Sequence, residues 1–436
     1  MHKTIYLCYF GVREPLVQTQ VLPYLRELTR KGDFTGQPTD EASAPLLNPG
    51  GELGVSLLTF EPARNEKDRA EFEKIKENLA AEGIEWEWLP YHKRFSAVAT
   101  AWDIFRGTVY IWRRIGRFDI LHARVHVPML MAALARKLSR HTPKLLFDIR
   151  GFFPEEYTDA GIWPEGGWLY RGAKRVERWL LKESDGFVVL TEKARDILFP
   201  ESRDAGCDKL GRPVEVIPCC VDFQKRFSFD RELFRDSIRE ELNLQDSFVI
   251  VHLGALGGLY LTEEIANFLA AAKRSNPRTF ALILSQTDTK ALEARLKDNG
   301  LGDGHYLAIR VLPSEVERYL IASDVGLSFV KSSYATQSRS PTKIPEYLVC
   351  GLPVISNRDV GDVNELIGPN RVGVLLNEFT PSEYKRALDE LESLGDVSER
   401  CREVAVKEFD LDRIGGPRYR KLYTKLLESS DDLESS

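Results

Sequence analysis

Short apolar runs alternate along the chain with segments in which apolar residues recur every three or four positions. The runs have strand length and are rich in branched side chains, as expected of strands buried on both faces of a parallel sheet. They cover residues 4–10, 55–60, 86–90, 145–149 and 186–190, and then 248–253, 280–284, 309–312, 325–330 and 352–355. The alternation predicts an α/β protein built from successive strand–helix units.

Helical periodicity fills the intervals between these runs. It predicts helices at 17–29, 67–82, 129–138 and 168–183, and further along at 262–274, 314–323, 389–409 and 418–427. Residues 32–54 are rich in glycine, proline, aspartate, serine and threonine, which is typical of a surface loop. The acidic residues 428–436 are predicted to form a frayed tail.

Length and composition narrow the class of protein. The 436 residues are too many for one ordinary core and suit two domains of about 200 residues each. With 43% hydrophobic and 29% charged residues, the chain has the composition of a folded globular protein. A net charge of −6 argues against nucleic-acid binding by the chain as a whole. The six cysteines form no C-x-x-C pair, and no leader-like or membrane-spanning apolar run is visible, so a cytoplasmic protein with reduced thiols is expected.

The stretch 338–356 carries the clearest candidate chemistry. Ser340 is expected to cap a helix that has Pro341 at its first position. A helix start offers unpaired N–H groups to an anion, and Arg339 and Lys343 would add positive charge for a phosphate or diphosphate. Glu346, one turn further on, could accept hydrogen bonds from the two hydroxyls of a ribose. The alternative is an ordinary capped helix in which Lys343 is only solvated.

A second candidate is the glycine-rich turn at residues 254–260, between a predicted strand and a predicted helix. Such a turn lets backbone N–H groups approach a phosphate. It is neither a P-loop, because it has no Gly-Lys-Ser/Thr, nor a dinucleotide-binding Gly-x-Gly-x-x-Gly. Gly11 follows the first strand in the same way, although turns often need glycine for reasons unrelated to ligands.

The sequence of residues 338–356 resembles the nucleotide-sugar site of glycosyltransferase family 4. This family, also called the group 1 glycosyltransferases, has the GT-B fold. The shared motif is Glu-x-x-x-x-Gly-x-Pro-Val, here Glu346, Gly351, Pro353 and Val354. The resemblance implies that Glu346 holds the ribose of the donor nucleotide. Many members carry a second glutamate eight positions earlier, where this chain has Ser338, which leaves the donor sugar and the activity itself open. The subgroup with Pro-x-Lys-x-x-Glu is the better match.

Other segments extend the resemblance. Residues 214–222 are similar to the usual junction of the two GT-B domains, and residues 119–124 to the Asp-x-x-His-x-His segment of the family, with Arg124 in place of the second histidine. In the family the loop after the strand at 145–149 faces the acceptor. The residues expected on this acceptor side are His122, Asp148, Arg150 and Glu155. The alternatives are a structural histidine and solvated loop acids.

The resemblance implies two Rossmann-like domains that face each other across a cleft. Their expected limits are 1–216, with 412–430 returning to it, and 217–411, followed by an acidic tail at 431–436. Most family members place an arginine and a lysine in the turn that is 254–260 here. This chain has neither, so Lys343 and Arg339 are predicted to supply the positive charge at the donor diphosphate as catalytic residues. Arg124, which can pair with a phosphate or a carboxylate, is the third predicted catalytic residue. The remaining predicted donor contacts are Thr342, Ser338, Gly254, Leu256, Gly257 and Gly11.

Residues 93–118 are basic and aromatic on an otherwise acidic chain. The basic residues are Lys93, Arg94, Arg106, Arg113, Arg114 and Arg117, interleaved with Trp102, Phe105, Tyr110 and Trp112 and with the single acid Asp103. Such a segment suits an anionic membrane surface or a lipid-linked acceptor. The alternative is an ordinary amphipathic helix that packs its aromatic side chains on the sheet.

Together these observations predict a glycosyltransferase that moves a sugar from a nucleotide-sugar donor to a hydroxyl of a glycan or lipid-linked acceptor. The resemblance implies retention at the anomeric carbon, no metal or other cofactor, and a role in surface polysaccharide or glycolipid assembly, peripheral to the inner face of the membrane. Two alternatives stay open. One is an inactive GT-B subunit that binds a nucleotide sugar or scaffolds a partner enzyme, and the other is a nucleotide-sugar epimerase.

Overall fold

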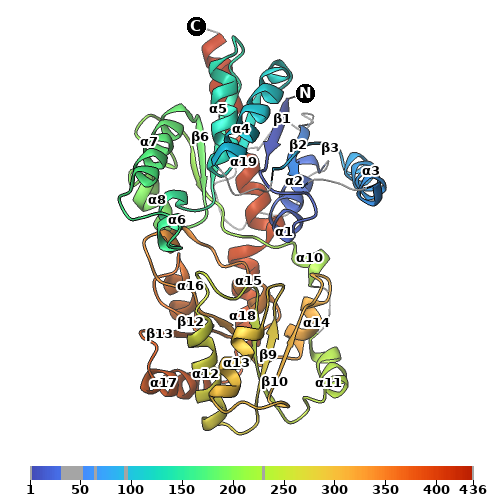
Figure 1. Cartoon of the computed structure of the whole chain (residues 1–436), viewed down its shortest axis with the longest axis vertical. Helices are drawn as coiled ribbons and strands as arrows, with labels where there is room; N and C mark the ends of the chain where they lie inside the picture. Colours follow the sequence, from blue (N-terminus) through green and yellow to red (C-terminus); the bar gives the residue numbers. More distant parts are fainter. Residues whose placement is uncertain (1, 31–52, 63–65, 93–96, 228–230, 435–436) are drawn as a thin grey trace. The chain divides into compact units, whose positions relative to one another are not determined.

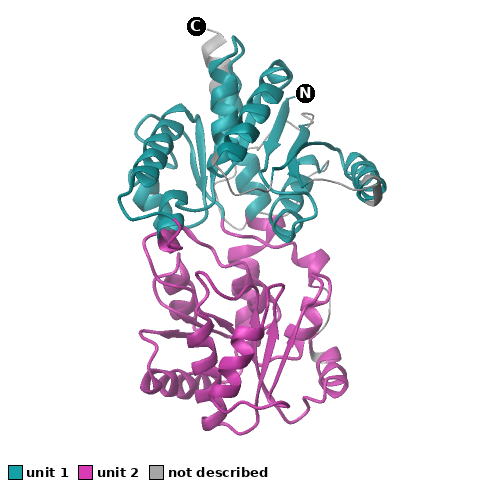
Figure 2. Cartoon of the chain, in the orientation of Figure 1, with its two compact units in different colours: residues 1–158, 163–217, 415–436 teal, residues 159–162, 218–414 magenta. Residues whose placement is uncertain are grey.

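The computed structural model describes residues 2–30, 53–62, 66–92, 97–227 and 231–434 (Figure 1). The chain divides into two compact units, coloured separately in Figure 2. Unit 1 comprises residues 1–158, 163–217 and 415–436, and unit 2 comprises residues 159–162 and 218–414. The loop predicted at 32–54 lies almost entirely outside the described residues, as do Lys93 and Arg94.

Unit 1 is built on a seven-stranded sheet of order β3-β2-β1-β4-β5-β6-β7 in which every recorded pairing is parallel. Its strands are β1 (Lys3–Leu7), β2 (Gly54–Glu61), β3 (Ile84–Pro90), β4 (Ile120–Arg124), β5 (Lys144–Ile149), β6 (Gly186–Val189) and β7 (Val214–Val216). Its helices are α1 (Pro15–Gln20), α2 (Leu22–Thr29), α3 (Glu66–Ala81), α4 (Ala97–Trp112), α5 (His126–Lys137), α6 (Phe153–Asp159), α7 (Trp168–Glu183), α8 (Glu192–Leu198), α9 (Ser202–Ala205) and α19 (Gly416–Glu434), with a 3-10 turn η1 (Ile115–Arg117).

Unit 2 repeats the plan with a six-stranded parallel sheet of order β10-β9-β8-β11-β12-β13. Its strands are β8 (Phe248–Leu253), β9 (Thr279–Leu284), β10 (Tyr306–Ile309), β11 (Val325–Ser328), β12 (Val354–Asn357) and β13 (Gly373–Leu376). Its helices are α10 (Phe223–Arg226), α11 (Arg231–Glu241), α12 (Thr262–Ser275), α13 (Lys290–Asp298), α14 (Val316–Ile321), α15 (Lys343–Val349), α16 (Val363–Asn370), α17 (Pro381–Leu394) and α18 (Ser398–Phe409), with short turns η2 (Ala335–Ser338) and η3 (Leu411–Gly415).

The predicted fold class is confirmed, because each unit is a Rossmann-like α/β unit whose strand order reverses at its first strand. Both faces of each sheet are covered, and strand interiors such as Phe147 and Leu282 are completely buried. The returning C-terminal helix is also confirmed, since α19 belongs to unit 1 and packs against α2 and β7 (Figure 1).

Four local predictions need correction. The helix expected at 17–29 is two helices that meet at Val21, and the one expected at 389–409 is two helices separated around Gly395, whose φ of +65° suits glycine. The strand expected at 309–312 is β10, which ends at Ile309. The last helix continues to Glu434, well past the predicted end at 427, so most of the expected frayed tail is helical.

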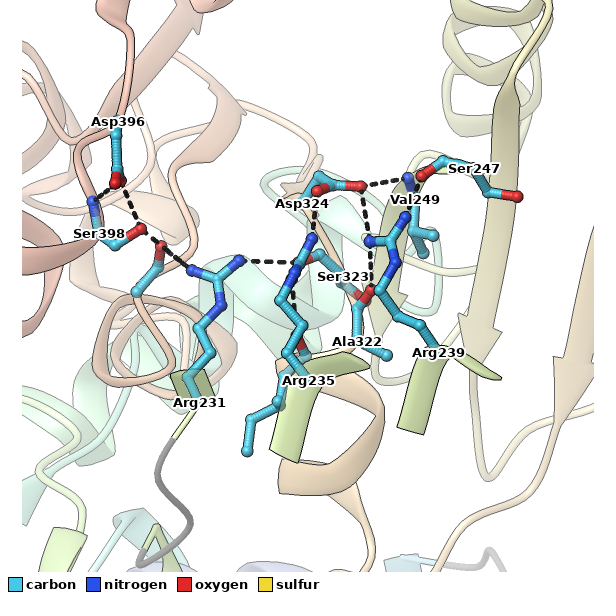
Figure 3. A network of polar contacts seen from close by, with 12 residues as sticks. Arg231, Arg235, Arg239, Ser247, Val249, Ala322, Ser323, Asp324, Asp396 and Ser398 are labelled. Carbon is cyan, nitrogen blue, oxygen red and sulfur yellow. Dashed lines mark hydrogen bonds and ion pairs between the residues drawn. The ribbon is translucent and has the colours of Figure 1, made fainter. Parts of the chain in front are cut away.

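A ladder of three arginines ties α11 to the rest of unit 2 (Figure 3). Arg231, Arg235 and Arg239 are four residues apart and therefore share one face of the helix. Their guanidinium groups donate to backbone carbonyls that end α14 and to Asp324, which also accepts from the Val249 N–H at 2.7 Å. The ladder thus satisfies carbonyl groups that a helix end leaves without intrahelical partners.

Candidate functional site

The centre of the sheet in unit 2 holds the candidate site. Strands β8 and β11 are adjacent and parallel, and the strand order reverses between them. In open α/β sheets, ligands bind beyond the carboxyl ends of the strands at such a point. The turn after β8 contains Gly254, and the segment after β11 leads into α15, which contains Lys343 and Glu346.

Helix α15 is held against these two strands by Tyr347. The Tyr347 hydroxyl accepts from the Leu253 N–H at 2.8 Å and donates to the Leu327 carbonyl at 3.2 Å. Its ring lies so close to Gly326 that a Cβ there would be 2.3 Å from a ring carbon. Arg231 bonds the carbonyl of Gly351, just beyond the other end of the helix, at 2.9 Å. The C-terminal half of α15 is therefore fixed by Tyr347, and the turn that follows it by Arg231.

Lys343 is the first residue of α15 and is only 5% exposed. Its Nζ lies 3.4 Å from the position that a Cβ on Gly254 would take, and 4.7 Å from the ring centroid of Tyr260. Among the described residues, this Nζ has no hydrogen-bond partner. Burial lowers the pKa of Lys343 to about 7, opposed by the negative charge of Glu346. The structure thus brings the predicted cation to the glycine turn, and a buried ammonium without a partner is poised to pair with an anion.

Glu346 is also buried, and its carboxylate pairs with Arg226 of α10 at 2.8 Å. Burial raises the pKa of Glu346, and Arg226 opposes that shift. The pair keeps an acceptor carboxylate beside Lys343. Arg226 precedes Glu346 by well over one hundred positions and was not among the predicted site residues.

The glycine turn has positive φ angles at Gly254 (117°), Gly257 (79°) and Gly258 (61°), which suit glycine. Two N–H groups expected to approach a phosphate have partners within the protein. Leu256 N–H donates to the Thr287 hydroxyl at 3.0 Å, and Gly257 N–H to the Thr262 hydroxyl at 2.9 Å. Threonine side chains thus fix the turn and already accept from these two N–H groups.

The residues just before α15 differ from the expected helix cap. Ser340 does not cap the helix, because the helix starts two residues beyond Pro341 and the Ser340 hydroxyl accepts from the Cys219 N–H at 3.1 Å. Thr342 holds the capping position without a side-chain cap and is exposed. Ser338 is buried and donates to the Ala335 carbonyl at 2.7 Å, and Arg339 is partly buried beside it.

In unit 1 four predicted residues meet in the interior. Asp148, at the end of β5, pairs with Arg150 at 2.8 Å and lies 3.8 Å from Arg124 and 3.7 Å from His122. Burial alone would raise the pKa of Asp148, but Arg150, His122 and Arg124 together lower it. Arg124 also donates to the Gln20 carbonyl at 3.2 Å, so its expected pairing with a ligand stays a prediction.

This interior group also anchors the returning helix. Tyr419 of α19 donates to Asp148 at 3.2 Å and accepts from Arg150 at 3.0 Å, and the Tyr423 hydroxyl lies 2.8 Å from His122 Nδ1. All of these contacts lie within unit 1. The acceptor-side residues of the prediction therefore hold the C-terminal helix to the sheet of unit 1.

The last two predicted positions lie at the carboxyl edge of the sheet in unit 1. Gly11 follows β1, and a Cβ there would be 2.8 Å from Oε2 of the buried Glu61, whose Oε1 accepts from the Val12 N–H at 2.7 Å. Glu155, in α6, accepts from Tyr170 and from Lys174, both at 3.0 Å. Their contacts are with Glu61, Tyr170 and Lys174, none of which belongs to the interior group around Asp148.

Comparison with sequence-family models identifies the chain. Residues 52–206 match the model of the glycosyl transferase 4-like domain, and residues 234–408 match that of glycosyl transferases group 1. The chain belongs to the group 1 glycosyltransferases. Comparison with curated protein sequences gave no significant match.

Solved glycosyltransferase structures share its fold at low sequence identity. Sucrose-phosphate synthase from Thermosynechococcus elongatus has a TM-score of 0.68 at 13% identity, with 98% of this chain and 100% of that one covered. WaaG, a glycosyltransferase involved in lipopolysaccharide biosynthesis, has a TM-score of 0.62 at 14% identity, covering 96% and 99%. HepE from Anabaena, in complex with UDP-glucose, has a TM-score of 0.60 at 14% identity, covering 99% and 100%.

Three residues of the candidate site were not among the predicted site residues. Arg226 reaches Glu346 through the fold alone, and no local pattern marks it. Tyr260, which lies by Lys343, ends the glycine-rich turn that the sequence singled out. His252, inside β8, is buried with its Nδ1 unpartnered, and burial together with the charge of Lys343 holds its pKa well below the usual value. A histidine inside an otherwise apolar strand was a visible signal for that residue.

Proposed function

We propose that this glycosyltransferase uses a nucleoside-diphosphate sugar as donor and that unit 2 binds it at the Gly254 turn. The observation that carries the proposal is Lys343, whose buried Nζ lies by that turn and has no hydrogen-bond partner in the part of the chain that the structure describes. Glu346 lies one turn further along the same helix, where a carboxylate can accept both hydroxyl protons of a ribose. HepE, a structural neighbour, is described as binding UDP-glucose.

Sugar transfer requires the protein to stabilise the negative charge of the nucleoside-diphosphate leaving group. When the sugar leaves, negative charge grows on the nucleoside diphosphate, and a cation placed beforehand stabilises the transition state. Lys343 is that cation, with Arg339 beside it in the chain. Arg226 pairs with Glu346 and opposes the rise in the pKa of Glu346 that burial causes, which favours the carboxylate that a ribose would need as acceptor. The proposed transfer is metal-independent, because these residues supply the positive charge that a metal would otherwise provide; retention at the anomeric carbon is carried over from the family resemblance.

The acceptor is a hydroxyl of a glycan or of a lipid-linked sugar. The predicted acceptor-side residues remain His122, Asp148, Arg150 and Glu155, with Arg124 as a further predicted catalytic residue. The remaining predicted donor contacts are Thr342, Ser338, Leu256, Gly257 and Gly11. The enzyme acts in the cytoplasm, peripheral to the inner face of the membrane, in surface polysaccharide or glycolipid assembly. No helix of the described residues is long and apolar enough to cross a bilayer.

A second candidate is a subunit that binds a nucleotide sugar without turning it over. The observation in its favour is Ser338, which stands where many family members have a second glutamate and whose hydroxyl is bonded to the Ala335 carbonyl. Release of free nucleoside diphosphate in the presence of an acceptor distinguishes the transferase from this subunit. An epimerase is distinguished in the same assay, because it leaves the nucleotide attached to its product.

The test is a thermal-shift panel of UDP-, GDP-, dTDP- and CMP-sugars. A ligand at about 100 times its dissociation constant adds about 2.7 kcal/mol of stability, which is readily measured. We expect one nucleotide series to stabilise the wild type and the control Lys385→Met, an exposed lysine on α17, but not Lys343→Met or Glu346→Gln. Equal stabilisation of all four proteins would place the donor site elsewhere.

A further inference from the structure

Helix α4 of unit 1 presents a line of exposed apolar side chains, continued by one residue just beyond α5. The exposed fractions are 78% for Val98, 51% for Trp102, 57% for Phe105, 45% for Trp112 and 66% for Leu138. We call these five residues the aromatic face. Large exposed apolar patches on a soluble protein mark interaction sites, and two tryptophans and a phenylalanine on one helix form such a patch.

The line is a consequence of helix geometry. At about 100° per residue, positions 98, 102, 105 and 112 fall within an arc of roughly 80°. The opposite side of the helix packs against α5, with Asp103, Gly107 and Ile111 buried. A Cβ on Gly107 would lie 2.4 Å from Sδ of Met131, so glycine permits this close approach. The expectation that the aromatic side chains pack on the sheet is therefore wrong for Trp102, Phe105 and Trp112.

Contacts among its members order the aromatic face. Trp102 and Phe105 stack with their ring centroids 5.6 Å apart. Trp112 donates from Nε1 to the Leu138 carbonyl at 3.0 Å, which joins α4 to the residue that follows α5. These contacts hold the aromatic rings in place on the exposed side of α4, opposite the side that packs against α5.

Positive charge flanks the aromatic face. Arg106 and Arg113 lie along one edge of it, about 60° to 80° around the helix from the line of aromatic residues. Neither forms an ion pair within the described part of the chain, whereas Arg114 pairs with Glu87 and Arg117 with Glu85. Asp103, the one acid of α4, is buried and bonded to Tyr9 at 2.8 Å. This edge is basic on a chain of net charge −6, which fits an anionic partner.

We propose that the aromatic face docks on the surface of a lipid bilayer with anionic headgroups, with Trp102, Phe105 and Trp112 at the level of the headgroups and Arg106 and Arg113 on lipid phosphates. Tryptophan and phenylalanine beside arginine are the pattern of a helix that lies in the plane of the interface. Each arginine near an anionic surface strengthens binding roughly fivefold. The inference rests on the proposed function only in its consequence, namely that docking brings the enzyme to a lipid-linked acceptor.

The experiment measures binding of the full chain to vesicles, with no donor or acceptor present. Vesicles of phosphatidylcholine alone are compared with vesicles that contain about 30 mol% phosphatidylglycerol. Because no sugar transfer is measured, failure of docking and failure of the proposed catalysis are separate results. Tryptophan fluorescence with brominated lipid reports whether the indoles reach the interface.

Two double variants and matched controls define the surface. We expect Trp102→Ser/Phe105→Ser to weaken binding at least tenfold, and Arg106→Gln/Arg113→Gln to weaken it roughly 25-fold on anionic vesicles only. The controls are Leu233→Ser/Leu312→Ser, which removes two exposed leucines of unit 2, and Arg274→Gln/Arg278→Gln, which removes two exposed arginines of unit 2. Both controls are expected to bind as the wild type does. Thermal melting confirms that each variant is folded.

Three results would overturn the proposal. The first is absence of binding to anionic vesicles, and the second is a loss of binding in the controls as large as in the α4 variants. The third is a concentration-dependent dimer, seen by sedimentation equilibrium, that Trp102→Ser/Phe105→Ser abolishes, because the occupant of the aromatic face would then be a second copy of the chain. Quenching of fluorescence by brominated lipid that disappears in the same variant supports docking.

Discussion

The buried ammonium of Lys343 predicts that donor binding takes up a proton. Without ligand, burial holds the pKa of this lysine at about 7, against an ordinary value of 10.5. A diphosphate beside Nζ stabilises the charged form and returns the pKa to its ordinary range or above. Binding therefore selects protonated Lys343, and the free enzyme loses that proton as the pH rises through 7.

The size of the effect follows from these two pKa values. If only protonated enzyme binds, the dissociation constant rises about tenfold between pH 6 and 8 and about 100-fold between pH 6 and 9. Since one pKa unit corresponds to about 1.4 kcal/mol, the loss at pH 9 is about 2.7 kcal/mol. At pH 8, about 0.9 proton should be taken up for each donor molecule bound.

The assay is isothermal titration calorimetry across pH 6 to 9, repeated in buffers of different ionisation enthalpy so that proton uptake is measured directly. The ligand is the nucleotide sugar selected by thermal shift. Free nucleoside diphosphate is avoided, because a terminal phosphate itself titrates near pH 6. Lys343→Arg is the matched control, since arginine stays charged throughout this range.

We expect the wild type to lose affinity with rising pH and Lys343→Arg to bind equally well at every pH tested. Lys343→Met should bind weakly and also independently of pH. A wild-type dissociation constant that is the same at pH 6 and pH 9 would refute the reasoning. So would a pH dependence retained in Lys343→Arg, because another group would then be titrating.

Three further perturbations test the structure by chemical denaturation. Asp148→Asn leaves two buried arginines uncompensated and should lower the free energy of unfolding by about 3–5 kcal/mol at pH 7. Because the pKa of Asp148 is lowered in the folded state, the wild type should lose this stabilisation as the pH falls below about 4. The variant should show no such loss. Gly254→Ala places a side chain at φ +117° and 3.4 Å from Lys343 Nζ, so it should cost about 1–3 kcal/mol and weaken donor binding, with Gly395→Ala, at the other end of unit 2, as the control for binding. Arg235→Met leaves the Ile321 carbonyl without its arginine donor, while Ser323 and Ala322 keep Arg231 and Arg239, and should cost about 2 kcal/mol. The exposed Arg278→Met should cost less than about 0.5 kcal/mol.

Most strands and helices were predictable because their signals are local. Buried parallel strands are continuous apolar runs, and their helices carry a regular period, so β8 and α7 begin and end where the sequence indicates. One error in a predicted helix boundary has a local reason, because Gly395 stops a helix that looked continuous. Another depends on a distant segment, because the Ser340 hydroxyl accepts from the Cys219 N–H and does not cap α15, which starts at Lys343.

The candidate site was partly predictable for the same reason. Lys343 and Glu346 are one turn apart on a single helix, so their spacing is encoded locally. That Lys343 meets the Gly254 turn depends on the order of β8 and β11, and the ion pair of Glu346 with Arg226 joins segments that no local pattern relates. The group around Asp148 was predicted on the acceptor side, because charge at a strand end is visible in the sequence. Its contacts with α19 are not visible there.

By itself the sequence determined which residues of each element share a face, because the helical period and the strand alternation follow from backbone geometry. It placed Trp102, Phe105 and Trp112 on one side of a helix, and Lys343 and Glu346 close together on another. Only the tertiary structure decided which side is buried. The free energy of burying a side chain depends on what packs against it, and those partners come from distant parts of the chain.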